Sequence, residues 1–296
     1  AYTFTAKCGF PYLCAAVNFG RRLWYSLMNI AISAHALCYN FCMSSRRLAI
    51  ANWKMNPPTL VEAKKIFAGI TMAASKTRNL EVVVCPPAPF IAPLKAGYSG
   101  KKIVFGAQDV HHEEKGSKTG EYAASMLKSI GVGFCIAGHS ERRAMGEDNA
   151  LIAKKIERII AAGMTAVLCV GERERDNSGA YLGVLKEQLK SALDPLPRVQ
   201  FANIVIAYEP VWAIGKTAKD AMQPSDVHGS VIFIRKTIAE FSSLAIASEI
   251  PILYGGSVEA VNANSLMRDG FMDGFLVGHA SLVPAEFKEI MEAAAM

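Results

Sequence analysis

Acidic residues are absent from the first part of the chain. No Asp or Glu occurs from Ala1 to Val61, whereas Lys7, Arg21 and Arg22 lie in this stretch together with four of the seven cysteines. This composition differs sharply from that of the remainder and indicates a boundary near residues 43–47. We therefore expect residues 1–45 to be an N-terminal extension and residues 46–296 to form one folded domain.

Two interpretations of the extension stay open. It lacks acidic residues and contains arginines, as targeting peptides do. Its apolar run over Leu23–Leu37 is too short, and too interrupted by polar residues, for a membrane span. Alternatively, residues 1–45 are not native structure or are disordered, because the chain starts with Ala and Met43 makes a natural first residue for the folded domain.

The chain also lacks the motifs of several functional classes. It contains no G-x-G-x-x-G fingerprint and no P-loop, so we expect neither a nicotinamide nor a nucleoside triphosphate, and no other cofactor. The net charge of +6 is spread thinly, without a dense Lys/Arg face interleaved with aromatics, which argues against nucleic acid as a partner. We expect no membrane attachment, and a small anionic metabolite as the ligand.

A complete set of metal ligands is missing too. His35, Cys38 and Cys42 have a spacing that metal ligands can have, but they lack a fourth partner. Residues 111–114 read His-His-Glu-Glu, but adjacent residues rarely share a face and loop solvation explains them better. We expect no metal site.

The cysteines outside the extension are few and lie in apolar surroundings. Cys85, Cys135 and Cys169 each fall inside a strand-like run, so we interpret them as small buried side chains of a reducing compartment rather than as a disulfide framework. This favours a cytoplasmic protein, unless residues 1–45 direct it to an organelle.

Eight short apolar runs alternate with helical patterns from Arg47 onwards. Such alternation requires parallel strands with crossover helices, and eight units match a closed barrel better than an open sheet. The sequence therefore predicts an α/β protein with a single (β/α)8 barrel. The expected strands are Leu48–Asn52, Glu81–Cys85, Ile103–Ala107, Gly133–His139, Ala166–Val170, Ile204–Glu209, Ile250–Tyr254 and Met272–Val277. The expected helices are Leu60–Ser75, Pro89–Ala96, Tyr122–Ile130, Asp148–Ala162, Tyr181–Leu193, Val227–Leu244, Val258–Met267 and Ala285–Ala293.

Chemically active residues follow the ends of the expected strands. The C-terminal ends of barrel strands form one rim, where the active site of such a fold lies. In chain order these residues are Asn52, Lys54, His139, Glu209, Gly255, Gly256, Ser257, Gly278 and His279.

Glu209 ends the expected strand Ile204–Glu209, and an unusual loop follows it. Pro210 cannot continue a ladder, so a loop begins there, and its residues 211–215 are apolar where loops are usually polar. An apolar loop beside a carboxylate is typical of a lid that excludes water from a reacting group. The alternative is a salt-bridged Glu209 beside a loop packed on the core.

The rim residues suit proton transfer on a small phosphorylated substrate. The glycine-bearing turns at 255–257 and 278–279 predict a phosphate cradle, because free backbone N–H groups bind anions. Glu209 suits a general base, His139 an acid or an electrophile that polarises a carbonyl, and Lys54 the neutralisation of negative charge. Together they predict proton abstraction next to a carbonyl through an enediolate.

Four segments carry a family resemblance. Ala51–Asn56, Ala137–Arg143, Ala207–Gly215 and Tyr254–Val258 resemble the signature segments of the triosephosphate isomerase family, in order and with the expected spacing, from about Arg46 to the C-terminus. The resemblance implies a TIM barrel that interconverts dihydroxyacetone phosphate and D-glyceraldehyde 3-phosphate, in glycolysis and gluconeogenesis.

The resemblance also implies individual roles. Glu209 would move the proton between the two carbons, His139 would shuttle protons at the substrate oxygens, and Asn52 and Lys54 would bind substrate. Glu141 matches the carboxylate that positions the lysine. The phosphate would be held through the backbone by a set comprising Gly215, Gly255, Gly256, Ser257, Gly278 and His279. Residues Thr119, Gly120 and Glu121 resemble the loop that enters a partner subunit, which implies a homodimer.

The chain departs from the family pattern in three places. The family lid commonly reads Gly-Thr-Gly-Lys-Thr-Ala, whereas Gly215 is followed directly by Lys216. His279 stands where the family has a second glycine, and would strain or crowd the site if that glycine needs a positive φ or a close approach to phosphate. Residues 171–176 look about one residue shorter than the family loop, which we interpret as surface variation.

These departures leave two alternatives to an active isomerase. The altered lid and His279 suggest a phosphate-binding barrel with impaired or lost catalysis. A different phosphosugar enzyme, a Schiff-base aldolase built on Lys54, is disfavoured because no apolar cage around this lysine is evident.

Overall fold

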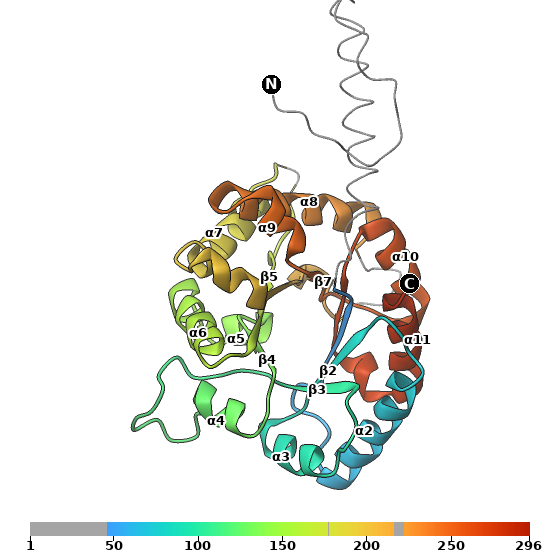
Figure 1. The fold of residues 1–296 in the computed structure, drawn as a ribbon. Coiled ribbons are helices and arrows are strands. Elements are labelled where there is room, and N and C mark those ends of the chain that lie inside the picture. The colour runs from blue at the N-terminus through green and yellow to red at the C-terminus, as the bar shows by residue number, and fades with distance from the viewer. Residues whose placement is uncertain (1–45, 177, 216–221) are drawn as a thin grey trace, which may run out of the picture. The chain divides into compact units, whose positions relative to one another are not determined.

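The computed structural model describes residues 46–176, 178–215 and 222–296, and Figure 1 shows their fold. Residues 1–45 lie outside the described residues, so the interpretations of the extension and the domain boundary stay predictions.

Eight parallel strands, joined in sequence order, close into a barrel, which confirms the predicted architecture. Barrel closure brings β8 beside β1, with Leu48 opposite Gly274. The strands are β1 (Leu48–Asn52), β2 (Glu81–Cys85), β3 (Ile103–Ala107), β4 (Phe134–Ala137), β5 (Thr165–Val170), β6 (Ile204–Tyr208), β7 (Ile252–Tyr254) and β8 (Gly274–Val277).

The helices form a ring around the barrel (Figure 1). The α-helices are α2 (Leu60–Ala74), α3 (Ala88–Ala96), α4 (Ala124–Ser129), α5 (Ser140–Ala144), α6 (Asn149–Ala161), α7 (Tyr181–Leu193), α8 (Pro224–Phe241), α9 (Leu244–Glu249), α10 (Ala260–Gly270) and α11 (Pro284–Ala294). The connections contain the 3-10 helices η1 (Arg198–Asn203), η2 (Val211–Ala213) and η3 (His279–Leu282).

The predicted boundaries were wrong in several places, each for a local reason. The helix expected over Val227–Leu244 ends at Phe241, because Ser243 caps a separate helix, α9, by accepting a hydrogen bond from the amide of Ile246 at 3.2 Å. The strand expected up to His139 ends at Ala137, since His139 is already the N-cap of α5, a short helix that the sequence analysis missed.

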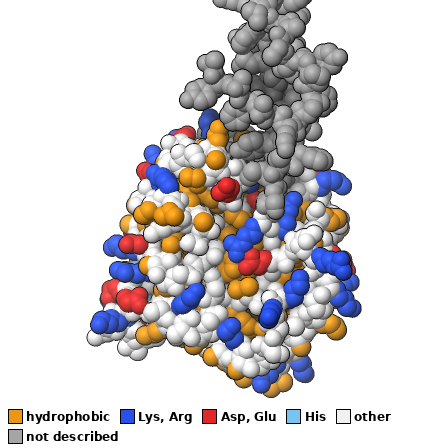
Figure 2. Space-filling view, viewed as in Figure 1, with side chains coloured by type: hydrophobic (Ala, Val, Ile, Leu, Met, Phe, Trp, Pro, Cys, Tyr) orange, Lys and Arg blue, Asp and Glu red, His pale blue; other side chains and the backbone are white. Residues whose placement is uncertain are grey.

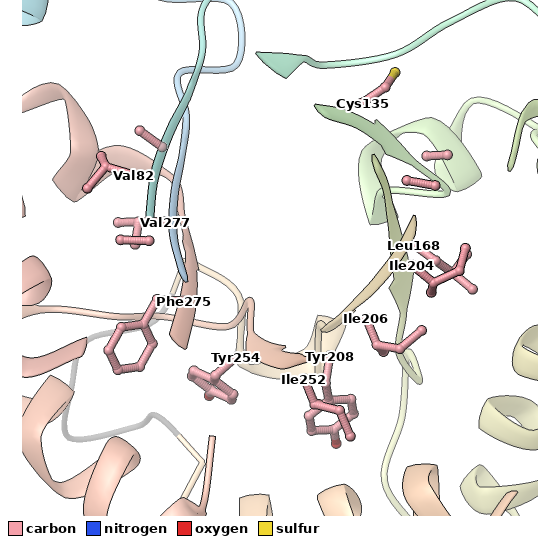
Figure 3. Close-up of a cluster of buried hydrophobic side chains, with 14 of the residues drawn as sticks. Val82, Cys135, Leu168, Ile204, Ile206, Tyr208, Ile252, Tyr254, Phe275 and Val277 are labelled. Carbon is pink, nitrogen blue, oxygen red and sulfur yellow. The ribbon is translucent and has the colours of Figure 1, made fainter. Parts of the chain in front are cut away.

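The alternation of side chains along the strands builds two apolar layers. The barrel interior holds one set, which includes Leu48, Ile50, Ile136 and Val205. The intervening residues face the helices. Figure 3 shows members of this outer layer, among them Ile206, Tyr208, Tyr254 and Phe275, projecting from the strands. Strands that are buried on both faces have nearly continuous apolar sequences. The apolar runs therefore predicted the strand positions well.

The face shown in Figure 2 carries both basic and acidic side chains. Figure 2 shows Lys and Arg side chains scattered among acidic and apolar ones on the face that it presents. Within the described ranges, no helix combines the length and the apolar character needed to cross a membrane.

Removal of part of the inner layer should destabilise the barrel. Ile136 is fully buried, so we expect Ile136→Ala to lower the free energy of unfolding by about 2–5 kcal/mol through lost burial and a cavity. The control is Val61→Ala on α2, where the side chain is 65% exposed and the change should stay within about 0.5 kcal/mol. Urea unfolding followed by circular dichroism measures both, and equal losses would contradict the layered packing.

Candidate active site

A cavity of about 840 Å³ opens where the strands end. Rim residues that are far apart in the sequence line it together, as barrel closure requires. Those that the sequence analysis singled out are Asn52, Lys54, His139, Glu209, Gly215, Gly255, Gly256, Ser257, Gly278 and His279. The cavity also borders Glu259 and Glu286, which the sequence analysis did not predict.

Glu209 is held at the floor of this cavity. Its side chain is almost fully buried; Oε2 accepts a hydrogen bond from the amide of Ser140 at 3.0 Å, and Oε1 lies 3.3 Å from Nε2 of His139. The backbone beside it leaves no spare room, because a Cβ at Gly171 would lie 1.7 Å from the carbonyl oxygen of Glu209. Neither Ser140 nor Gly171 was predicted, and their signal was only proximity to a strand end.

His139 presents one particular nitrogen to the cavity. As the N-cap of α5, its Nδ1 accepts a hydrogen bond from the amide of Glu141 at 3.2 Å. A ring nitrogen that accepts a hydrogen bond carries no proton, so the imidazole proton sits on Nε2, the atom that faces Glu209. This arrangement suits a neutral hydrogen-bond donor to a substrate oxygen.

Lys54 occupies an unusual backbone conformation, with φ of 51°. Its amide donates to Oδ1 of Asn52 at 3.1 Å, and its carbonyl oxygen accepts from Nε2 of Gln108 at 2.8 Å. A left-handed conformation at a non-glycine residue costs about 1–3 kcal/mol and persists where neighbours impose it. Gln108 is a further residue that the sequence analysis missed.

Glu141 reaches the lysine rather than the cavity. Its Oε1 lies 2.7 Å from Nζ of Lys54, the contact that the resemblance implied. Partial burial raises the pKa of Glu141, but the hydrogen bond and the charge of Lys54 lower it further, so the pKa lies below its usual range. The carboxylate of Glu141 is therefore ionised at neutral pH and pairs with Lys54.

The base of the predicted lid is tied to Glu172. This carboxylate is 1% exposed and accepts hydrogen bonds from Nε1 of Trp212 and the hydroxyl of Tyr208, both at 2.9 Å. Burial raises the pKa of Tyr208, so its hydroxyl keeps its proton for this bond. In the loop over residues 171–176, Gly171 and Glu172 are buried, while Arg173, Glu174 and Asp176 are exposed; the interpretation of its shorter length as surface variation stays a prediction. The expected lid tip, within residues 216–221, lies outside the described residues.

The glycine-bearing turns border the same cavity as Glu209. Ser257 Oγ donates to the carbonyl oxygen of Ala213 at 2.9 Å, which links the turn after β7 to the lid base. Positive φ angles at described non-glycine residues occur at Lys54, Asn79 and Phe271, and His279 is not among them. The expectation that histidine would strain the backbone here was therefore wrong.

The histidine pair after β3 does share a face, contrary to the sequence argument. The rings of His111 and His112 lie 4.3 Å apart, and with Glu113 they place potential ligand atoms within 4.8 Å of one another. However, Nδ1 of His111 accepts the amide of Glu113 at 3.0 Å, and the Glu113 carboxylate pairs with Lys118 at 3.1 Å. Protein groups therefore engage one ring nitrogen of His111 and one carboxylate oxygen of Glu113, and the absence of a metal site stays a prediction. The other candidate set, His35, Cys38 and Cys42, lies outside the described residues.

The loop resembling a subunit-entering segment projects from an ionic network. Its residues Thr119, Gly120 and Glu121 are exposed. At its base, Nζ of the buried Lys155 lies 2.6 Å from both Asp109 and Glu147. Arg142 also contacts both acids, at 2.8 and 2.6 Å. Burial raises the pKa of Asp109, whereas Lys155 and Arg142 outweigh burial at Glu147 and lower its pKa.

Comparison with known proteins gives a consistent result. The family model for triosephosphate isomerase matches residues 47–294. The chain is 41% identical over 259 residues to the triosephosphate isomerase of Rhodopirellula baltica, covering 85% of this chain and 99% of the relative. It is 41% identical over 253 residues to that of Thiobacillus denitrificans (84% and 99%) and 37% identical over 260 residues to that of Colwellia psychrerythraea (85% and 99%).

Removing the lysine from the buried ionic network of Lys155, Asp109, Glu147 and Arg142 should destabilise the fold. Lys155→Met removes the cation between Asp109 and Glu147, and we expect it to lower the free energy of unfolding by about 3–5 kcal/mol at neutral pH. Without Lys155 the pKa values of both acids rise in the folded state. A raised folded pKa adds stability as pH falls, so the loss should shrink towards about pH 5.

The control is Lys186→Met, because Lys186 and Glu240 form an exposed pair at 2.6 Å. Its loss of stability should be much smaller than that of Lys155→Met and should depend little on pH, because water screens an exposed pair. Denaturant unfolding at several pH values measures both variants, and similar costs would show that the Lys155 network adds nothing beyond a surface pair.

Proposed function

The chain belongs to the triosephosphate isomerase family, and from this premise we propose that it interconverts dihydroxyacetone phosphate and D-glyceraldehyde 3-phosphate through an enediolate. One observation carries the proposal: a buried carboxylate and an imidazole Nε2 lie 3.3 Å apart in a cavity that also receives Lys54 and two glycine-bearing turns. Proton abstraction next to a carbonyl needs a base, a donor to the carbonyl oxygen and a counter-charge, and these three groups match those needs.

Glu209 is the base. The carboxylate takes a proton from C1 of dihydroxyacetone phosphate, and the electrons pass to the carbonyl oxygen at C2. The hydroxyl on C1 then gives its proton to the oxygen on C2, and return of the carboxyl proton to C2 leaves an aldehyde at C1 and a hydroxyl at C2. The hydrogen bond from the Ser140 amide holds this carboxylate in the cavity. Only 2% of the surface of Glu209 is exposed, so fixed polar groups of the protein replace water around its carboxylate. This environment suits a site that is closed to solvent.

His139 and Lys54 stabilise the charge that develops on oxygen. The Nε2–H of His139 donates to the substrate oxygens and moves protons between them, because Nδ1 is occupied by the Glu141 amide. Lys54, held by Glu141 and Gln108, supplies positive charge beside Asn52. The backbone of Gly215, Gly255–Ser257 and Gly278–His279 receives the phosphate.

The two alternatives have less support. The relatives carry the name of an active isomerase over nearly their whole length, so loss of catalysis is not supported. A Schiff-base aldolase requires an uncharged lysine, whereas Lys54 forms a salt bridge with the Glu141 carboxylate at 2.7 Å.

We further propose a homodimer. The exposed loop at residues 119–121 would enter a second copy, and several large apolar side chains are exposed in the single chain. Met55, directly after Lys54, is 93% exposed, and Tyr122 and Met126, just beyond the loop, are 45% and 53% exposed. Covering such side chains would stabilise the association of two copies.

The cytoplasm is the proposed location. The buried cysteines Cys85, Cys135 and Cys169 are free, and burial raises the pKa of their thiols, which suits a reducing compartment. Targeting by residues 1–45 stays a separate prediction.

Removal of the base should abolish turnover. Glu209→Gln keeps the size of the side chain and loses the proton acceptor, so we expect kcat for isomerisation of glyceraldehyde 3-phosphate to fall by at least about 10²–10⁴-fold. Glu62→Gln on the exposed face of α2 is the matched control and should keep full activity. Slow turnover by the unsubstituted chain, or equal activity of the two variants, would refute the proposed function.

The dimer can be tested with two methionines. Met55→Glu places a charge where a second copy would pack, and we expect sedimentation to report a mass of one chain instead of two. Met72→Glu, on α2 at 65% exposure, should remain a dimer. If the unsubstituted protein sediments as one chain, or if both variants dissociate alike, the proposed interface is wrong.

A further inference from the structure

The cavity contains more carboxylates than its anionic ligand would favour. Among the described residues that line it, Glu209, Glu259 and Glu286 are acidic, and Lys54 is the one lysine or arginine. Carboxylates that line the cavity repel a phosphate dianion, and Glu259 is partly offset, because its side chain accepts a hydrogen bond from the amide of Asn262 at the start of α10. His139 cannot compensate without losing the role of its ring nitrogens, because Nδ1 accepts the Glu141 amide and Nε2 faces Glu209.

His279 lies where an additional cation would help. It is an exposed residue at the mouth of the cavity, at the start of η3 directly after Gly278. The turn adjoins the catalytic lysine, since a Cβ at Gly278 would lie 3.5 Å from Cε of Lys54. η3 packs against α11, which carries Glu286, and against β1, which precedes Lys54. The remaining titratable groups facing the cavity are Glu209, Glu259 and His139.

We propose that the imidazole of His279, when protonated, binds the substrate phosphate and offsets Glu259 and Glu286, so that substrate affinity depends on pH at this position. The inference rests on the proposed isomerase function and goes beyond it, because backbone groups alone would give a cradle without this titration. A phosphate receives about one more charge-assisted hydrogen bond from an imidazolium than from a glycine at the same position.

The opposing view is that His279 only crowds the phosphate. The backbone at His279 is not in the left-handed region, so strain does not enter, and the two views differ in sign. If the side chain attracts phosphate, its removal weakens binding at low pH. If the side chain crowds phosphate, its removal tightens binding at every pH.

Three substitutions separate charge from bulk. His279→Asn keeps a polar side chain without charge, His279→Lys makes the charge permanent, and His279→Gly removes both charge and bulk. KM and kcat for glyceraldehyde 3-phosphate are measured from about pH 5.5 to about pH 8.5, a range over which histidine changes charge. Ratios to the unsubstituted chain at each pH cancel the ionisation of the substrate itself.

We expect His279→Asn and His279→Gly to raise KM about 3-fold at the acid end, with kcat unchanged, and to match the unsubstituted chain at the alkaline end. His279→Lys should keep a low KM throughout. The acid-end difference should shrink in about 0.5 M salt, because the side chain is exposed and its charge is screened. His228→Asn is the control, since His228 stacks on Phe271 at 4.3 Å and does not line the cavity.

A KM ratio for His279→Asn that stays at one across the pH range overturns the inference, as does a lower KM for His279→Gly at every pH. Calorimetric titration with inorganic phosphate repeats the comparison without catalysis. If the unsubstituted chain shows no turnover, the proposed function fails, but phosphate affinity of the same variants still decides the role of His279.

Discussion

Closure of the barrel between β8 and β1 is the constraint on which every part of the site depends. The two strands approach so closely that a Cβ at Gly274 would lie 1.8 Å from the carbonyl oxygen of Leu48, and Gly274 adopts φ of 145°. Only glycine meets both conditions without strain. Closure places the end of β8, with the Gly278–His279 turn, beside Lys54 at the end of β1, although these segments are more than two hundred residues apart.

At the rim of the closed barrel, backbone amides bind side chains of the candidate site. The amides of Ser140 and Glu141 begin α5; the first donates to the carboxylate of Glu209 and the second to the imidazole of His139. Unsatisfied amides at a helix start are ordinary, but here two neighbouring residues use them to orient the two groups that act together in the proposed mechanism. The same short helix carries Glu141 to Lys54, so α5 connects the three charged or titratable parts of the proposed mechanism.

Two buried carboxylates outside the reaction hold the lid base and the projecting loop. Glu172 ties the lid base through Trp212 and Tyr208, and Glu147 ties the loop after β3 through Lys155. Each acid is buried beside groups that offset its charge, although Oε2 of Glu147 has no hydrogen-bond partner. The residues near the reaction therefore rest on a layer of polar contacts that spacing along the chain does not reveal.

The order of residues along the chain is enough to specify the eight-strand barrel and the set of rim residues. Apolar runs that alternate with helical patterns fold as parallel strands joined by helices, and eight such units favour a closed barrel. Residues just after parallel strands then lie at one edge of the sheet. Which atoms face one another depends on the folded chain. The roles of Ser140, Gln108, Gly171 and Glu172 come from contacts across strands, and a linear pattern carries no signal for these. Folding likewise brings His111 and His112 onto one face and keeps His279 out of a left-handed backbone, because φ angles and side-chain directions follow from packing and not from residue spacing.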